Sequence, residues 1–149
     1  MDQECVAVED DDAAVAAGGP QGWVRLWNRR HPWEDELLTF CARIGGNGME
    51  AAVHNVVVHN EAPEKFVGEL AESFAGWSGA KVWESLDRDV RIKAVFRNGG
   101  HVDLTWRLAP WRRDDAWQAE VTFQVEAGEE MRKLAADMGV LLGCGQGEP

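Results

Sequence analysis

The feature that most constrains the fold is a pair of alternating segments joined by a glycine turn. Residues 90–97 and 101–108 each carry an apolar side chain at every second position, a pattern typical of strands with one buried face. Between them stands the triplet Asn98-Gly99-Gly100, whose residues readily adopt the positive φ angles of a short hairpin loop. The sequence therefore predicts an antiparallel hairpin.

The three-residue loop also predicts the register of this hairpin. It places four apolar pairs face to face: Phe96 with Val102, Ala94 with Leu104, Ile92 with Trp106 and Val90 with Leu108. A slip of one residue would turn all of these side chains toward solvent. On the polar face, the same register sets Arg91 opposite Arg107. Residues 117–125 alternate in the same way, which extends the hairpin to a three-stranded meander over residues 83–126.

The rest of the chain predicts further strands and two helices. Residues 23–27 are interpreted as a short edge strand, with a helical turn as the alternative because the two tryptophans are four residues apart. Residues 36–44 and 49–58 are interpreted as a hairpin closed by the loop 45–48. A helix is expected after Asn60, and a second helix from Glu129. Their apolar stripes are Phe66, Val67, Leu70, Ala71 and Phe74 in the first, and Met131, Leu134, Ala135, Met138, Leu141 and Leu142 in the second.

These elements predict an α+β fold in the order strands, helix, three-stranded meander, helix. A five- or six-stranded, mostly antiparallel sheet with both helices packed on one face would bury every apolar stripe. The length of 149 residues fits one domain. We expect a disordered acidic leader over 1–21, a single domain over 22–143 and a flexible tail over 144–149.

The charge of the chain narrows the class of partner. The net charge is −11, and six of the acids lie in residues 1–14, which leaves about −5 for the remainder. An acidic surface argues against nucleic acid, because phosphate contacts need basic side chains. The three cysteines are far apart and form no disulfide framework. No apolar run could span a membrane and the N-terminus is acidic, so we expect a cytoplasmic protein without membrane contact.

No arrangement of residues predicts catalysis, a metal or a cofactor. The serines stand in no nucleophile motif, and His54 and His59 point to opposite faces of one predicted strand. Cys41 is interpreted as a small buried hydrophobic residue. Asp87 and Asp89 are interpreted as solubilising acids at an exposed strand end. We therefore predict that the protein is not an enzyme.

Four stretches of the sequence are similar to one known family. They are Gly76-Trp77, the segment 83–87 (Trp-Glu-Ser-Leu-Asp), the segment 100–104 (Gly-His-Val-Asp-Leu) and the segment 125–130 (Val-Glu-Ala-Gly-Glu-Glu). With these residues the chain resembles a small actinobacterial family catalogued as domain of unknown function sixty-two twenty-eight, over roughly residues 22–142. The resemblance implies a bacterial protein and brings no activity, cofactor or site residue with it.

The candidate site consists of residues without an evident folding role. Trp106 and Trp117 are predicted to lie in the core, and Trp77 and Trp83 to pin the crossover into the meander. The residues left as candidates for partner binding are His101, Arg91, Arg107, Trp111, Arg112 and Arg113. Trp and Arg are the residues that dominate protein-binding hot spots.

The leading hypothesis is a non-enzymatic, protein-binding domain, as a monomer or weak homodimer. An immunity-like role, in which the protein neutralises a toxin, is one form of it and rests on analogy alone. The alternative is a small ligand-binding or enzymatic domain. It would have a pocket between the helices and the sheet edge, near Trp77, Trp83 and His101.

Overall fold

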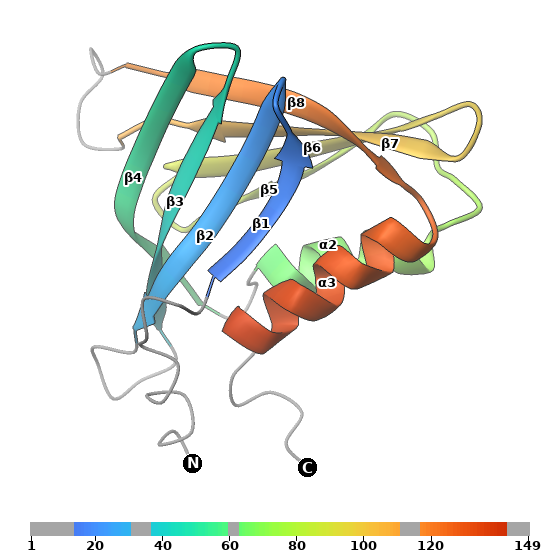
Figure 1. Cartoon of the computed structure of the whole chain (residues 1–149). Coiled ribbons are helices and arrows are strands. Elements are labelled where there is room, and N and C mark those ends of the chain that lie inside the picture. The colour runs from blue at the N-terminus through green and yellow to red at the C-terminus, as the bar shows by residue number, and fades with distance from the viewer. Residues whose placement is uncertain (1–13, 31–36, 60–62, 111–116, 143–149) are drawn as a thin grey trace.

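The chain forms two four-stranded antiparallel sheets, each followed by a helix. Figure 1 shows the computed structural model, which describes residues 14–30, 37–59, 63–110 and 117–142. Sheet A contains β1 (Ala14–Gly19), β2 (Gly22–Arg30), β3 (Leu38–Gly46) and β4 (Met49–Val58), and is followed by α2 (Pro63–Glu72). Sheet B contains β5 (Ala80–Glu84), β6 (Val90–Arg97), β7 (His101–Leu108) and β8 (Ala119–Glu126), and is followed by α3 (Glu129–Leu142). Neither helix is long and apolar enough to cross a membrane.

The predicted hairpin and its register are confirmed in sheet B. β6 pairs with β7 so that Phe96 meets Val102, Ile92 meets Trp106 and Val90 meets Leu108. The loop residues Gly99 and Gly100 have φ angles of 88° and 80°, which is the conformation that the triplet predicts. β8 adds to β7 as expected, and β5 adds to the other side of β6 as a fourth strand.

The prediction of a single five- or six-stranded sheet with both helices on one face is wrong. The strands divide into two separate sheets, because β4 pairs only with β3 and β5 only with β6 among the described strands. Figure 1 shows the two sheets crossing, with α2 and α3 side by side beneath them. Alternation shows that each strand buries one face, but it does not show whether that face is covered by a helix or by a second sheet.

The N-terminal part of sheet A also differs from its prediction. β1 lies within the stretch 1–21 that the sequence pattern assigns to a leader. As a result β2, predicted as a short edge strand, lies between β1 and β3. The small residues of β1 give little signal for a strand, and only Val15 of its side chains is buried. Residues 1–13 lie outside the described residues.

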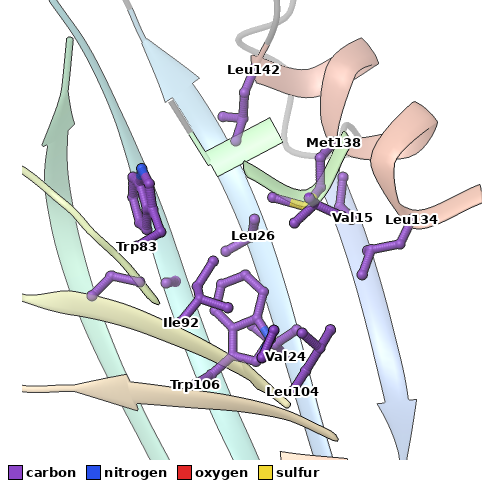
Figure 2. Packing of buried hydrophobic residues seen from close by; sticks show 14 of the residues in the cluster. Val15, Val24, Leu26, Trp83, Ile92, Leu104, Trp106, Leu134, Met138 and Leu142 are labelled. Carbon is purple, nitrogen blue, oxygen red and sulfur yellow. The ribbon is translucent and has the colours of Figure 1, made fainter. Parts of the chain in front are cut away.

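The core lies between the inner faces of the two sheets and is closed by the helices. Figure 2 shows Val24 and Leu26 of β2 facing Ile92, Leu104 and Trp106 of sheet B, with Leu134 and Met138 of α3 beside them. Trp106 is 1% exposed. The helical stripe of α3 is confirmed, since Met131, Leu134, Met138, Leu141 and Leu142 are buried.

Two aromatic residues that were predicted to be buried are exposed. Trp117 is 45% exposed and Phe74 is 61% exposed. Both lie just outside the element to which the pattern assigned them, because β8 begins at Ala119 and α2 ends at Glu72. Helix and strand ends are the part of a sequence prediction that a periodic pattern defines least well.

Candidate functional site

Three of the predicted site residues lie on the outer face of sheet B. Arg91 stands opposite Arg107, as the register predicts. Each guanidinium has a polar neighbour: Arg91 Nε is 3.8 Å from Glu84 Oε2, and Arg107 Nε donates to Gln118 Oε1 at 3.1 Å. Arg107 also pairs in register with Glu120 on β8. Arg91 thus has an acidic neighbour and Arg107 a neutral hydrogen-bond partner within sheet B.

His101 lies at the end of the same face. It is exposed and stands between Arg97 on β6 and Glu126 on β8. Arg97 in turn binds Asp103 at 2.8 Å. The other predicted residues, Trp111, Arg112 and Arg113, lie outside the described residues, so a role for them stays a prediction.

An open groove lies on another side of the molecule. It encloses about 670 Å³ between the β1–β2 hairpin (16–22), β8 (122–125) and the first turns of α3. At Gly22 a side chain would approach the Thr122 carbonyl oxygen to 2.9 Å, so glycine allows the hairpin to lie close to β8. The groove does not involve Trp77, Trp83 or His101, where the alternative hypothesis places a pocket.

The charged side chains that line this groove already have partners. Lys133 Nζ is 3.0 Å from Asp137 Oδ2, and Glu130 Oε1 accepts a hydrogen bond from the Glu126 amide at 2.8 Å. A binding pocket for a small molecule has polar groups that converge on the ligand. Here the charged groups bind their own neighbours, so they are not available to a ligand in this groove.

The outer face of sheet A carries a group of aromatic and cationic side chains. Alternation in β2 places Trp23, Arg25 and Trp27 on this face, and the register sets Arg25 opposite Arg43 on β3. His54 of β4 is exposed at the other side. We call this group, Trp23, Arg25, Trp27, Arg43 and His54, the sheet A face.

Trp27 lies at the centre of the sheet A face. The guanidinium carbons of Arg25 and Arg43 lie 5.0 and 5.3 Å from the centroid of its ring, which is within the range of cation–π attraction. The His54 ring meets the Trp27 ring edge-on, with 6.1 Å between centroids and 87° between planes. Two guanidinium groups and one imidazole therefore contact the Trp27 indole.

Neither guanidinium of this face is neutralised by an acid within the part of the chain that the structure describes. The ion pairs formed there involve other basic residues, while Arg25 and Arg43 contact the indole. Glu50, in the next row opposite Gly45, is not within ion-pair distance of either. On the side of β1, the small residues Ala14 and Ala16 are the register partners of Trp27 and Arg25. The two arginines are therefore open to an anionic group from outside.

A glycine positions the second indole of the face. Trp23 pairs in register with Gly45 on β3. A Cβ atom at Gly45 would lie 2.4 Å from Trp23 Cζ2, closer than real atoms approach. The Trp23 ring therefore lies directly on the backbone of β3, and this contact requires glycine.

Two irregular strand segments orient His54 and Asn28. The pairing shifts near Asn28 in β2 and between Phe40 and Ala42 in β3, and Asn28 and Asn55 have φ angles of 62° and 58°. Such bulges redirect side chains. Here His54 Nδ1 lies 3.4 Å from Cys41 Sγ, and Asn28 Nδ2 donates to the same sulfur at 3.5 Å.

Cys41 is the register partner of Trp27 and is buried, as predicted. Its contacts with His54 and Asn28 hold the imidazole against Trp27 and so fix the shape of the sheet A face. Cys41 and His54 are two residue types that can bind a metal. Among the described residues, no three His, Cys, Asp or Glu side chains come together around a possible metal position.

Part of this site could have been found in the sequence. The alternation Trp23-Val24-Arg25-Leu26-Trp27 places two indoles and a guanidinium on one face of any strand. The interpretation of this segment as a short edge strand or a helical turn does not include this face among the candidate sites. The contribution of Arg43, His54 and Asn28 depends on which strands are neighbours and where the bulges fall, which alternation does not reveal.

The structure also corrects the interpretation of Asp89 as an exposed acid. Asp89 is only 4% exposed and closes the β5–β6 connection. The Ser85 hydroxyl donates to Asp89 Oδ1 at 2.5 Å and accepts from the Val90 amide at 3.1 Å. Burial raises the pKa of the Asp89 carboxyl above its ordinary value, and the hydrogen bond from Ser85 only partly opposes this. Asp89 is thus a structural residue of this turn.

The raised pKa predicts how stability depends on pH. The folded chain keeps the Asp89 proton at pH values where the unfolded chain has lost it, so this contribution to stability is present below about pH 4 and is lost as pH rises through the folded pKa. Asp89→Asn keeps an acceptor for Ser85 and should be free of this loss. Relative to the parent, the variant should gain stability as pH rises from about 4 toward neutrality.

The measurement is the free energy of unfolding in urea over a pH series. Glu69→Gln, which neutralises an exposed acid on α2, is the control and should follow the parent over this pH range. If the parent instead gained stability over Asp89→Asn as pH rises, the fold would favour the carboxylate and this account of Asp89 would be wrong.

The fold has a counterpart among solved structures. The chain is similar to the structure described as the plant transcriptional regulator PBF-2, with a TM-score of 0.50 and 10% sequence identity over 87% of this chain and 82% of the other. At this identity the likeness concerns the fold alone. A search of curated protein sequences gives no match.

The family resemblance drawn from the sequence is confirmed. A family model described as a family of unknown function, DUF6228, matches residues 15–144. This match includes β1 from Val15 onward, all later strands and both helices. It also includes every residue of the sheet A face. The chain belongs to the DUF6228 family.

Proposed function

We propose that this protein is a non-enzymatic, protein-binding domain that recognises an acidic segment of its partner through the sheet A face. The observation that carries the proposal is the pair of guanidinium groups around Trp27, which have no carboxylate partner among the described residues. The carboxylate of a glutamate side chain can accept hydrogen bonds from both arginines while the methylene groups of that side chain pack on the indole. Trp and Arg are also the residues enriched in binding hot spots.

The contrast with sheet B supports this choice of surface. There Arg91 is paired with Glu84 and Arg107 donates a hydrogen bond to Gln118, so a partner would first have to displace existing contacts. On sheet A, the cation–π contacts hold the guanidinium groups in place without neutralising them. Side chains already ordered in this way lose less entropy when a partner binds.

An immunity-like role is a special case of the same proposal. It requires a toxin whose surface presents clustered carboxylates to the sheet A face. Binding would bury the Trp27 and Trp23 rings, since these are the apolar parts of the face. We place this function in the cytoplasm, where a buried thiol such as Cys41 stays reduced.

A nucleic-acid ligand is the second candidate, and it has specific support. The solved structure with a similar fold is described as a transcriptional regulator, and an indole flanked by arginines can stack on a base while the arginines contact phosphates. The net charge of −11 opposes it, because long-range repulsion weakens the approach of a polyanion. A short acidic peptide segment carries less charge per length than nucleic acid, and so is favoured.

The two candidates can be separated by calorimetric titration of the full-length protein. One probe is an oligoglutamate peptide, and the other is a single-stranded oligonucleotide of the same net charge. We expect the peptide to bind more tightly at low ionic strength and to weaken as salt is added. Tighter binding of the oligonucleotide would replace the proposal by the nucleic-acid candidate, and binding of neither probe would overturn it.

A further inference from the structure

The basic sheet A face stands in contrast to the charge of the chain as a whole. Four consecutive acids, Glu9-Asp10-Asp11-Asp12, lie two residues before the start of β1 at Ala14. They are the densest negative charge in the sequence. Arg25 and Arg43 are two cations without an acidic partner among the described residues. The two groups have complementary charges and belong to the same part of the chain.

The register of sheet A places Ala14, where the acidic segment joins β1, next to the sheet A face. Ala14, the first residue of β1, pairs directly with Trp27, and Ala16 pairs with Arg25. An extended chain covers at most about 3.5 Å per residue, so Asp12 lies within about 7 Å of Ala14 and Glu9 within about 17 Å. Arg43, two strands away from β1, is displaced by only about 10 Å at the usual strand spacing. All four carboxylates can therefore reach the guanidinium groups.

We propose that residues 9–12 bind the sheet A face of the same molecule and compete there with the acidic partner. This inference rests on the proposed function, because it assigns a regulatory occupant to the same surface. A tether this short gives an effective concentration in the millimolar range. Each exposed ion pair contributes little, so the segment occupies the face while a partner with a better fit can displace it.

The proposal gives the acidic segment a specific consequence. A weak intramolecular competitor lowers the apparent affinity of every acidic ligand by the same factor, since the free face is only a fraction of the total. It leaves the ratio of affinities between ligands unchanged and raises the intrinsic affinity that any acidic partner needs in order to occupy the face. Because the competition is electrostatic, its effect should fade as ionic strength rises.

The first test neutralises the segment. The variant Glu9→Gln, Asp10→Asn, Asp11→Asn and Asp12→Asn should bind oligoglutamate about fivefold more tightly than the parent at low salt, as expected for release of a millimolar tethered competitor. A matched control removes four exposed acids on other elements: Glu69→Gln, Glu72→Gln, Glu120→Gln and Glu129→Gln. The control changes net charge equally and should raise the affinity by less than about twofold.

The second test needs no ligand and reads the contact directly. NMR spectra are recorded on the full chain labelled with ¹⁵N. The Trp27 indole resonance should move in the variant neutralised at residues 9–12, called the leader variant, and stay in place in the control variant. The shift should not depend on protein concentration, since the contact is within one molecule. A shift that grows with concentration would mean that the segment binds a second copy, and would overturn the proposal.

These two tests separate the inference from the proposed function. If the parent binds oligoglutamate but neutralising residues 9–12 changes neither the affinity nor the Trp27 resonance, the inference is overturned and the proposed function stands. If no variant binds oligoglutamate, the proposed function fails. In that case a ligand-free shift of the Trp27 resonance in the leader variant alone would still support the intramolecular contact.

Discussion

Replacing Arg25 and Arg43 together by glutamine is expected to weaken binding of the oligoglutamate probe by about thirtyfold, or about 2 kcal/mol. Each guanidinium is half-buried beside Trp27 and lacks an acid among the described residues. A charge-assisted hydrogen bond in this setting, partly screened by solvent, contributes about 1 kcal/mol. Calorimetry at low ionic strength measures the change.

The matched control for this prediction is Arg91→Gln with Arg107→Gln. It changes net charge by the same amount and removes an equivalent pair from the outer face of sheet B. Since those arginines already have partners in the sheet, the affinity for oligoglutamate should change by less than about twofold. Equal losses in both double variants would mean that only net charge matters, and would remove the sheet A face as the site.

Trp106→Ala is expected to destabilise the fold more than any surface change. Trp106 lies in the centre of β7, pairs with Ile92 and Val121 on either side, and is 1% exposed. Removing a buried indole costs about 3–5 kcal/mol through lost contacts and the cavity that remains. A domain of this size has only about 5–15 kcal/mol of stability in total. The midpoint of urea unfolding should therefore fall sharply or the variant should fail to fold.

Trp106→Phe keeps the prediction testable if the alanine variant does not fold. The indole Nε1 of Trp106 has no hydrogen-bond partner in the described structure, so phenylalanine loses packing but no hydrogen bond. We expect a cost of about 2 kcal/mol and a folded protein. A cost equal to that of the alanine variant would show that the indole nitrogen makes an essential bond, contrary to this account of the core.

The features that could be predicted from the sequence are those that depend on neighbouring residues. The β6–β7 register followed from a three-residue turn and two alternating strands, because the side-chain period of two leaves one register that buries both apolar rows. The stripe on α3 and the break before it followed from the 3.6-residue period in the same way. The hairpin between β3 and β4 is predicted by the loop 45–48, and the structure shortens this loop to Asn47-Gly48 because Gly45 and Gly46 pair with Glu50 and Met49.

The arrangement of these elements could not be predicted in the same way. Whether β4 continues into one sheet with the later strands, or ends a sheet of its own, depends on contacts between segments far apart in the chain. The apolar face of a strand can be buried either by a helix or by a second sheet, and the alternation is the same in both cases. Likewise β1 is identified as a strand by its pairing with β2, since its alanines carry little preference for a sheet.

The candidate site, like the fold, could be predicted from the sequence only in part. Arg91 and Arg107 were singled out because the predicted register made them a like-charge pair, and that pair exists. The neighbour of Arg91, Glu84, lies on β5, a strand that the alternation does not predict. The sheet A face was missed because it combines residues from three strands, and its centre at Trp27 depends on bulges at Asn28 and Asn55.

The location of oligoglutamate binding by NMR is the most direct test of the central claim that sheet A carries the binding surface. Indole resonances report on each tryptophan separately, and backbone amides report on the strands. The account predicts that Trp27, Trp23 and the amides around Arg43 shift first as peptide is added, while Trp77 and Trp117 stay in place. Shifts confined to sheet B around Arg91 and Arg107, with Trp27 unmoved, would contradict it.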